Sequence, residues 1–345
     1  AWCRLLAIIP AMRAAAIPRR RCLQALALAG VPALGAAQGL VTIRLSHVVA
    51  RQTPKGLALE RFRERVQALS QGRIQVVIYP NSVLYGDADE IQALQLGAVD
   101  MLAPSLSKFG RIGFPEFELF DLPFLFDSKA QVHRVMHGAI GKELLAALER
   151  QRMVGLGYLD NGFKHMSANR PLLAPQDFVG LRMRIQSSRV IAHQMRALGA
   201  KPVVLGFGET RRALATGVVD GTENPVSNLW TQRMHEVQTD LSLTRHGYLG
   251  YCVVVNQRFW NHLRPGDRAL VQQAMAEALD WGNTIAQYEN DEALANLRLG
   301  GGTRIHAPDE AQRQRLRQAT QEVALGLQGR IGRQWMDRVR AVLGG

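Results

Sequence analysis

The sequence predicts an α/β protein built from two similar halves, each with the order strand–helix–strand–helix–strand. Short segments that alternate apolar and polar residues indicate the strands, apolar residues at helical spacing indicate the helices, and an internal repeat relates the two halves. This order of elements is typical of a mostly parallel sheet covered by helices. The chain has 345 residues, 47% of them hydrophobic, which suits a globular protein of two lobes.

The first half begins with a strand over Val41–Ser46. Thr53 supplies an N-cap oxygen and Pro54 fits the first position of the helix that follows. Leu59, Phe62, Val66 and Leu69 lie on one face of this helix. The elements expected next are a strand over residues 74–78, a helix over residues 87–96 and a strand over residues 98–103.

The second half repeats this order. We expect strands over residues 181–185 and 202–205, helices over residues 188–198 and 209–216, and a last strand from Val218 onward. Residues 93–100 (ALQLGAVD) resemble residues 213–220 (ALATGVVD), 120 positions later. The two halves therefore look like copies of one unit.

Long helices are expected in the last third, over residues 270–299 and 312–343. We expect four regions in all. They are a signal peptide over residues 1–37, lobe I mainly over 38–160, lobe II mainly over 161–255, and a helical region over 256–345 that packs across both lobes.

Residues 1–37 have the features of an export signal. Arg19–Arg21 are followed by an apolar run over residues 22–34 and by the small residues 35–37, so cleavage is expected near Ala37. An N-terminal core helix is the alternative. Cys252 would be the one cysteine left in the mature chain, which therefore forms no intramolecular disulfide.

The net charge of +13 does not indicate a nucleic-acid partner. Five of the arginines lie in residues 1–37, which contain no acidic residue, and the remaining excess of eight is interleaved with Asp and Glu. No nucleophile elbow, phosphate loop or dinucleotide fingerprint occurs. His133 and His137 have the spacing of a zinc pair but lack the accompanying Glu, and a solvated helix face is favoured. We therefore expect no catalytic residues, cofactor or metal.

Polar residues gather where the predicted strands end, which is the edge of an α/β sheet at which ligands bind. Arg184 can hold a carboxylate through two parallel hydrogen bonds, although a surface ion pair is an equal alternative. Lys164, after an expected turn at residues 160–162, adds a positive charge, and the amide of Asn224 can donate to the same carboxylate. These residues favour an anionic ligand.

The region from about residue 41 to 260 resembles the solute-binding proteins of tripartite ATP-independent periplasmic (TRAP) transporters, specifically their C4-dicarboxylate branch. The runs that carry this resemblance are residues 46–50, 53–56, 93–109, 120–124, 160–164, 180–188, 220–225 and 246–251. The resemblance implies a two-lobed, type II-like periplasmic binding protein, exported and without enzymatic activity. It would capture a C4-dicarboxylate and deliver it to the membrane permease of the transporter.

The resemblance also implies a set of ligand-binding residues. The carboxylate clamp of the family falls on Arg184, its amide on Asn224, its pocket aromatic on Phe207 and its second basic residue on Lys164. The candidates for the second carboxylate are His47, Lys55, Ser105, His246 and Tyr248.

This sequence departs from the family pattern at Leu159, Gly208, Arg211 and Thr222, which leaves the distal half of the ligand open. A monocarboxylate, keto acid or sugar acid is the alternative ligand. A periplasmic enzyme that uses His47 or His246, and a basic protein that binds acidic polymers, are the alternative functions.

Overall fold

The computed structural model describes residues 39–344, so the predicted signal peptide and its cleavage near Ala37 lie outside the described residues. The described chain forms one sheet of nine strands with the order β2-β1-β3-β8-β4-β7-β5-β6, and β9 pairs with β8 outside this path. None of the helices within residues 39–344 combines the length and apolarity that a membrane span requires.

The predicted repeat is present in the structure. Lobe I, the half that contains the first three strands, has the order β1 (Val41–Ser46), α1 (Pro54–Leu69), β2 (Ile74–Tyr79), α2 (Glu90–Leu96) and β3 (Met101–Leu102). Lobe II, the half that contains the next parallel set, has the order β5 (Arg182–Ile185), α5 (Arg189–Ala197), β6 (Lys201–Val204), α6 (Phe207–Ala215) and β7 (Gly221–Asn224). All strand pairs within each set are parallel.

The repeated aspartates make the same contacts in both lobes. Asp100, just before β3, accepts hydrogen bonds from the backbone and the guanidinium of Arg44. Asp220, just before β7, accepts the same set from Arg182. Each aspartate thereby ties the first strand of its lobe to the third, which explains the repeat in physical terms.

Two long antiparallel strands that the sequence did not indicate join the lobes. β4 (Met153–Ala168) and β8 (Asp240–Asn256) pair with each other along most of their lengths. β8 also pairs with β3 of lobe I, and β4 pairs with β7 of lobe II. The turn predicted at residues 160–162 is wrong, because these residues lie within β4, where the register with β8 shifts between Asp160 and Gly162. The predicted boundaries of the two lobes remain predictions.

The remaining elements connect or cover the sheet. Before lobe II they are the 3-10 helices η1 (Leu106–Ile112) and η2 (Pro115–Asp121), α3 (Lys129–Met136), α4 (Ala139–Ala147), and the 3-10 helices η3 (Leu148–Gln151) and η4 (Pro175–Phe178). After lobe II they are α7 (Val226–Thr231), η5 (Met234–Glu236), α8 (Gln257–His262), α9 (Pro265–Gly300), β9 (Arg304–His306), α10 (Glu310–Ile331) and α11 (Arg333–Leu343).

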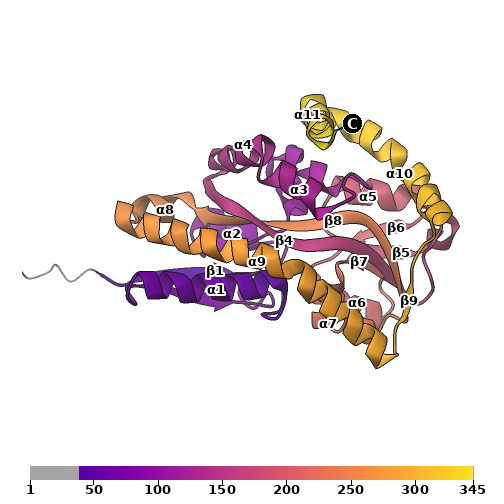
Figure 1. Cartoon of the computed structure of the whole chain (residues 1–345), viewed down its shortest axis with the longest axis horizontal. Coiled ribbons are helices and arrows are strands. Elements are labelled where there is room, and N and C mark those ends of the chain that lie inside the picture. Colours follow the sequence, from indigo (N-terminus) through magenta and orange to yellow (C-terminus); the bar gives the residue numbers. More distant parts are fainter. Residues whose placement is uncertain (1–38, 345) are drawn as a thin grey trace, which may run out of the picture. The chain divides into compact units, whose positions relative to one another are not determined.

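The expected long C-terminal helices are present. α9 has 36 residues and lies beside α1, while α10 and α11 lie on the other side of β4 and β8 (Figure 1). The helix predicted over residues 312–343 is interrupted at Gly332, whose φ of 99° is unfavourable for other residues. Within α9, Gly282 lies against Ala58 of α1 and Leu159 of β4, so closely that a Cβ atom there would be 2.6 Å from the Ala58 Cβ.

Candidate binding site

A small, partly open cavity of about 20 Å³ lies between lobe I and lobe II. It contains five of the nine predicted ligand-binding residues, but not Tyr248: Lys55, Ser105, Arg184, Phe207 and Asn224. The other lining residues are Val48, Val49, Asp87, Lys108, Gln186, Asn228, Leu249 and Tyr251. The cavity is therefore formed by the ends of β1, β5 and β7, the start of α1, the start of α6 and part of β8.

Arg184 is the largest polar side chain of this cavity and is only 1% exposed. Its Nε donates to the backbone oxygen of Leu205 at 3.0 Å, and its guanidinium carbon lies 5.7 Å from the centre of the Phe207 ring. Burial lowers the pKa of Arg184, although Asp87 and Glu223 partly oppose this effect. An arginine stays protonated even so, and within residues 39–344 no carboxylate forms an ion pair with it. Arg184 is thus a buried cation whose charge is not neutralised by direct pairing.

Lys55 is a second buried cation of this kind. Its Nζ donates to the backbone oxygen of Ala103 at 2.9 Å and lies 3.9 Å from the centre of the Tyr251 ring. Burial lowers the pKa of Lys55 to about 7, with a further contribution from Lys108 and partial opposition from Glu90. No described carboxylate pairs with Lys55, so a negative charge placed in the cavity would stabilise its protonated form.

Lys108 differs from Lys55 because it is paired. Its Nζ lies 2.5 Å from Asp87 and also contacts Glu90. These two carboxylates keep the pKa of Lys108 raised despite its burial. The formal charges around the cavity come from three cations and two carboxylates and sum to +1. They belong to Lys55, Lys108, Arg184, Asp87 and Glu90.

Hydroxyl and amide groups complete the polar part of the lining. The Ser105 Oγ is buried without a hydrogen-bond partner in the described chain. The Asn224 Nδ2 donates to Thr222 at 3.2 Å, and Asn228 and Tyr251 both accept hydrogen bonds from Asn161. Buried polar atoms without partners are costly, so the free Ser105 hydroxyl indicates a place where a ligand oxygen can bind.

Lys164 and His246 do not line this cavity. Lys164 lies 3.0 Å from Glu223, and the Nε2 of His246 lies 2.9 Å from the other oxygen of the same carboxylate. Burial alone raises the pKa of Glu223, but Lys164 and His246 outweigh this effect and lower it to about 2. Asp121 lies 3.6 Å from the Lys164 Nζ. The four residues form a buried polar cluster, in which Glu223 directly precedes Asn224 in the sequence.

His47 also lies outside the lining. It is completely buried, and neither ring nitrogen has a hydrogen-bond partner in residues 39–344. Burial and the nearby charge of Lys55 lower its pKa to about 3, so the imidazole is neutral. His133, one of the two histidines with the spacing of a zinc pair, forms a hydrogen bond of 2.6 Å with Asp160. Across the described residues no group of three or more His, Cys, Asp or Glu side chains is arranged to hold a metal ion.

Sequence reasoning did not single out Asp87, Lys108 or Tyr251. Lys108 lies three residues after Ser105, so one turn of η1 brings both side chains to the same cavity. Asp87 was expected only as the first residue of the helix over residues 87–96. Tyr251 is on β8, a strand that the sequence did not indicate.

The sequence and the fold both match known solute-binding proteins. The family model described as bacterial extracellular solute-binding protein, family 7, matches residues 45–327. The C4-dicarboxylate-binding periplasmic protein DctP of Rhodobacter capsulatus is 48% identical over 318 residues, which are 92% of this chain and 95% of that protein.

Two solved TRAP periplasmic solute-binding proteins have the same fold. The structure from Sulfurospirillum deleyianum, with bound succinate, is 40% identical with a TM-score of 0.86 and covers 88% of this chain and 99% of its own. The structure from Pseudomonas aeruginosa, with bound L-malate, is 36% identical with a TM-score of 0.80 and covers 83% of this chain and 99% of its own.

Proposed function

Because the chain belongs to family 7 of the bacterial extracellular solute-binding proteins, we propose that the cavity between its lobes binds a C4-dicarboxylate dianion such as succinate, malate or fumarate. The observation that carries the proposal is the presence of two buried cations without paired carboxylates, Arg184 of lobe II and Lys55 of lobe I. Two carboxylates on one ligand would neutralise both. The relatives named above, two of them with bound dicarboxylates, support this choice.

In this proposal each end of the ligand has its own partners. Arg184 and Asn224 hold one carboxylate through charge-assisted hydrogen bonds, and Phe207 excludes water from it. Lys55 and Ser105 hold the second carboxylate. Because these partners come from both lobes, binding favours the arrangement in which the lobes are in contact.

The remaining predicted site residues act indirectly. Lys164 and His246 fix the carboxylate of Glu223, which precedes Asn224 on β7, and so they are positioning residues. His47 is a neutral group whose pKa is lowered by burial and by the nearby charge of Lys55. No step of this function needs a cofactor, a metal or a nucleic acid, and no group of the cavity is assigned to catalysis.

The protein would act outside the cytoplasm after removal of its signal peptide near Ala37 and would deliver the acid to a TRAP membrane permease. Deletion of the gene should abolish high-affinity succinate uptake by cells. Re-expression of the wild-type chain should restore this uptake, while re-expression of the Arg184→Ala variant should not.

A direct test compares succinate with butyrate, which has the same carbon chain but one carboxylate. A ligand at one hundred times its dissociation constant stabilises a protein by about 2.7 kcal/mol, which a thermal-shift measurement detects. We expect stabilisation by succinate, malate and fumarate, and much less by butyrate or by a sugar acid such as gluconate. Equal stabilisation by butyrate would refute the dicarboxylate assignment. Recovery of unchanged malate and fumarate after incubation would exclude their interconversion by an enzyme.

A further inference from the structure

The carboxylate of Asp87 connects the two lobes at the boundary of the binding cavity. Asp87 belongs to lobe I, just before α2, and its Oδ2 accepts a hydrogen bond of 2.6 Å from the backbone nitrogen of Phe207, the first residue of α6 in lobe II. Its other oxygen lies 2.5 Å from the Lys108 Nζ. These contacts hold the side chain in one place at the junction.

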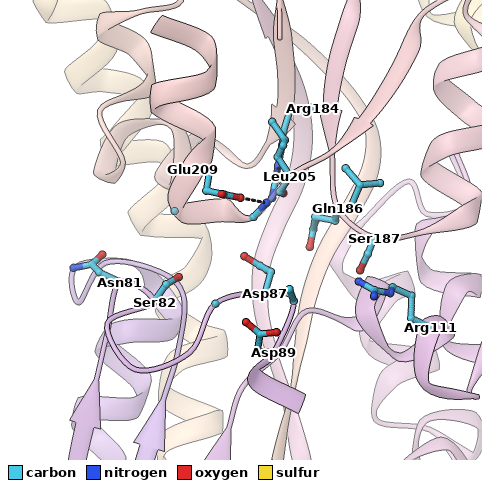
Figure 2. Close-up of a pocket in the computed structure, with 15 residues that line it drawn as sticks. Asn81, Ser82, Asp87, Asp89, Arg111, Arg184, Gln186, Ser187, Leu205 and Glu209 are labelled. Atoms are coloured by element: carbon cyan, nitrogen blue, oxygen red, sulfur yellow. Dashed lines mark hydrogen bonds between the residues drawn. The ribbon is translucent and has the colours of Figure 1, made fainter. Parts of the chain in front are cut away.

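A second cavity lies on the other side of Asp87. This outer compartment has a volume of about 520 Å³, enough for a small organic molecule. Asp87, Arg184 and Gln186 line both the outer compartment and the ligand cavity, so these three side chains form the wall between them. Figure 2 shows Asp87 among the residues that line the outer compartment, with Glu209 and Arg184 on one side of it and Asp89 on the other.

The outer compartment carries groups that could bind part of a larger acid. Arg111 projects into it beside Gln186 and Ser187 (Figure 2). A tricarboxylate that placed two carboxylates in the ligand cavity could direct its third one toward Arg111. The side chain of Asp87 blocks this path sterically, and its negative charge repels the third carboxylate.

We propose that Asp87 is a specificity-determining residue that limits this site to ligands with two carboxylates, because it closes the ligand cavity and repels a third carboxylate. This inference rests on the proposed function. Asp87 is ionised at neutral pH: burial alone raises its pKa, but Lys108, Arg184 and the Phe207 N–H lower it to about 2. The repulsion therefore persists over the whole physiological range.

The test measures the affinities of succinate and of tricarballylate, which is succinate extended by one carboxymethyl group. The Asp87→Ser variant removes the charge and opens the wall. Asp87→Asn removes the charge alone and keeps an oxygen for the Phe207 N–H. Asp89→Ser is the matched control, since Asp89 lines the outer compartment but not the ligand cavity.

For Asp87→Ser we expect the affinity for tricarballylate relative to that for succinate to rise at least about tenfold over the ratio in the wild type. Asp87→Asn should give a smaller gain, and Asp89→Ser no gain beyond about twofold. An equal gain in Asp89→Ser would show a general charge effect and overturn the inference. So would an equal change in the affinities for both acids in folded Asp87→Ser, which would make Asp87 a positioning residue.

The failure of this inference is distinguishable from failure of the proposed function. The affinity of the wild type for succinate tests the proposed function. The change in tricarballylate affinity between the variants tests the role of Asp87 in specificity. If the wild type binds tricarballylate as tightly as succinate, Asp87 does not limit the site to two carboxylates, but the proposal that the site binds dicarboxylates still holds.

Discussion

Arg182 and Arg184 are two residues apart on β5, yet Arg182 forms an exposed ion pair with Asp220 while Arg184 is buried in the binding cavity. The difference follows from their places along the strand. Arg182 begins β5, where the repeated aspartate ties β5 to β7, and Arg184 lies near its carboxyl end, where ligands bind in α/β sheets. One short strand therefore carries a structural arginine and an arginine that we propose binds the ligand.

This pair supplies a matched comparison. Arg184→Ala should weaken succinate binding by about two to three orders of magnitude, because a buried charge pair that loses one partner costs about 3–5 kcal/mol. Arg182→Ala should change the dissociation constant by less than about threefold, since its ion pair is exposed. Isothermal titration calorimetry on both variants checks this. Similar affinities for Arg184→Ala and the wild type would rule out the clamp.

Lys55 should determine the preference for two carboxylates. Lys55→Met keeps most of the side-chain volume but removes the charge, so we expect succinate to lose at least about tenfold in affinity while butyrate changes little. Lys201→Met, a change at an exposed lysine of β6, serves as the control. If succinate retained its advantage over butyrate in Lys55→Met, the second carboxylate would have to bind elsewhere.

The pH dependence of the unliganded protein should also report on Lys55. Burial lowers the pKa of Lys55 to about 7, whereas its ordinary value is 10.5. Between these values the unfolded state holds a proton that the folded state has lost, so this group makes the free energy of unfolding rise with pH from about 7 to about 10.5. Urea denaturation across this range should give a flatter profile for Lys55→Met than for the wild type. Parallel profiles would contradict the assigned pKa.

Lys164 should mainly affect the stability of the folded protein. Lys164→Met leaves Glu223 buried without a paired cation, because burial lowers the pKa of His246, and we expect a loss of about 3–5 kcal/mol in the free energy of unfolding, with weaker succinate binding. Lys164→Arg should restore both, and Lys142→Met at an exposed position of α4 should change neither. A loss of succinate affinity without a loss of stability would instead place Lys164 in direct contact with the ligand.

Two glycines in long helices should respond oppositely to alanine. Gly326→Ala in α10 has open space for the methyl group and should stabilise the protein by up to about 1 kcal/mol through helix propensity. Gly282→Ala in α9 should destabilise it, since the new Cβ would lie 2.6 Å from Ala58 and 3.0 Å from Leu159. Thermal unfolding of both variants checks the signs. Stabilisation by Gly282→Ala would mean that α1 and α9 can move apart freely.

Much of the fold could be predicted from the sequence because each lobe is built from local signals. Thr53 caps α1 as predicted and accepts a hydrogen bond from the Gly56 nitrogen. The internal repeat of the sequence indicated the positions of α2 and α6. β4 was missed because its glycines at residues 155, 157 and 162 look like turn residues. In the structure they lie at register shifts within one continuous strand, which depend on a partner far away in the sequence.

The candidate site was predicted only in part, because local signals fix some of its residues and distant strand pairing fixes others. Arg184 and Asn224 end short strands whose direction is fixed by the local pattern. Lys164 was expected in the cavity, but β4 shifts register with β8 between Asp160 and Gly162 and again between Lys164 and Met166. Each shift changes which face of the sheet the next side chain occupies, and a single sequence does not show such shifts.

The exchange of strands between the lobes has a consequence for how the chain folds. The sheet of lobe I is completed by β8, whose Val255 pairs with Met101 about 150 residues earlier in the chain. The strands of lobe I are thus synthesised long before β8, and β3 has an unpaired edge until β8 is available. Such a high contact order favours slow folding and prolonged exposure to aggregation, which a chaperone that holds the nascent chain would relieve.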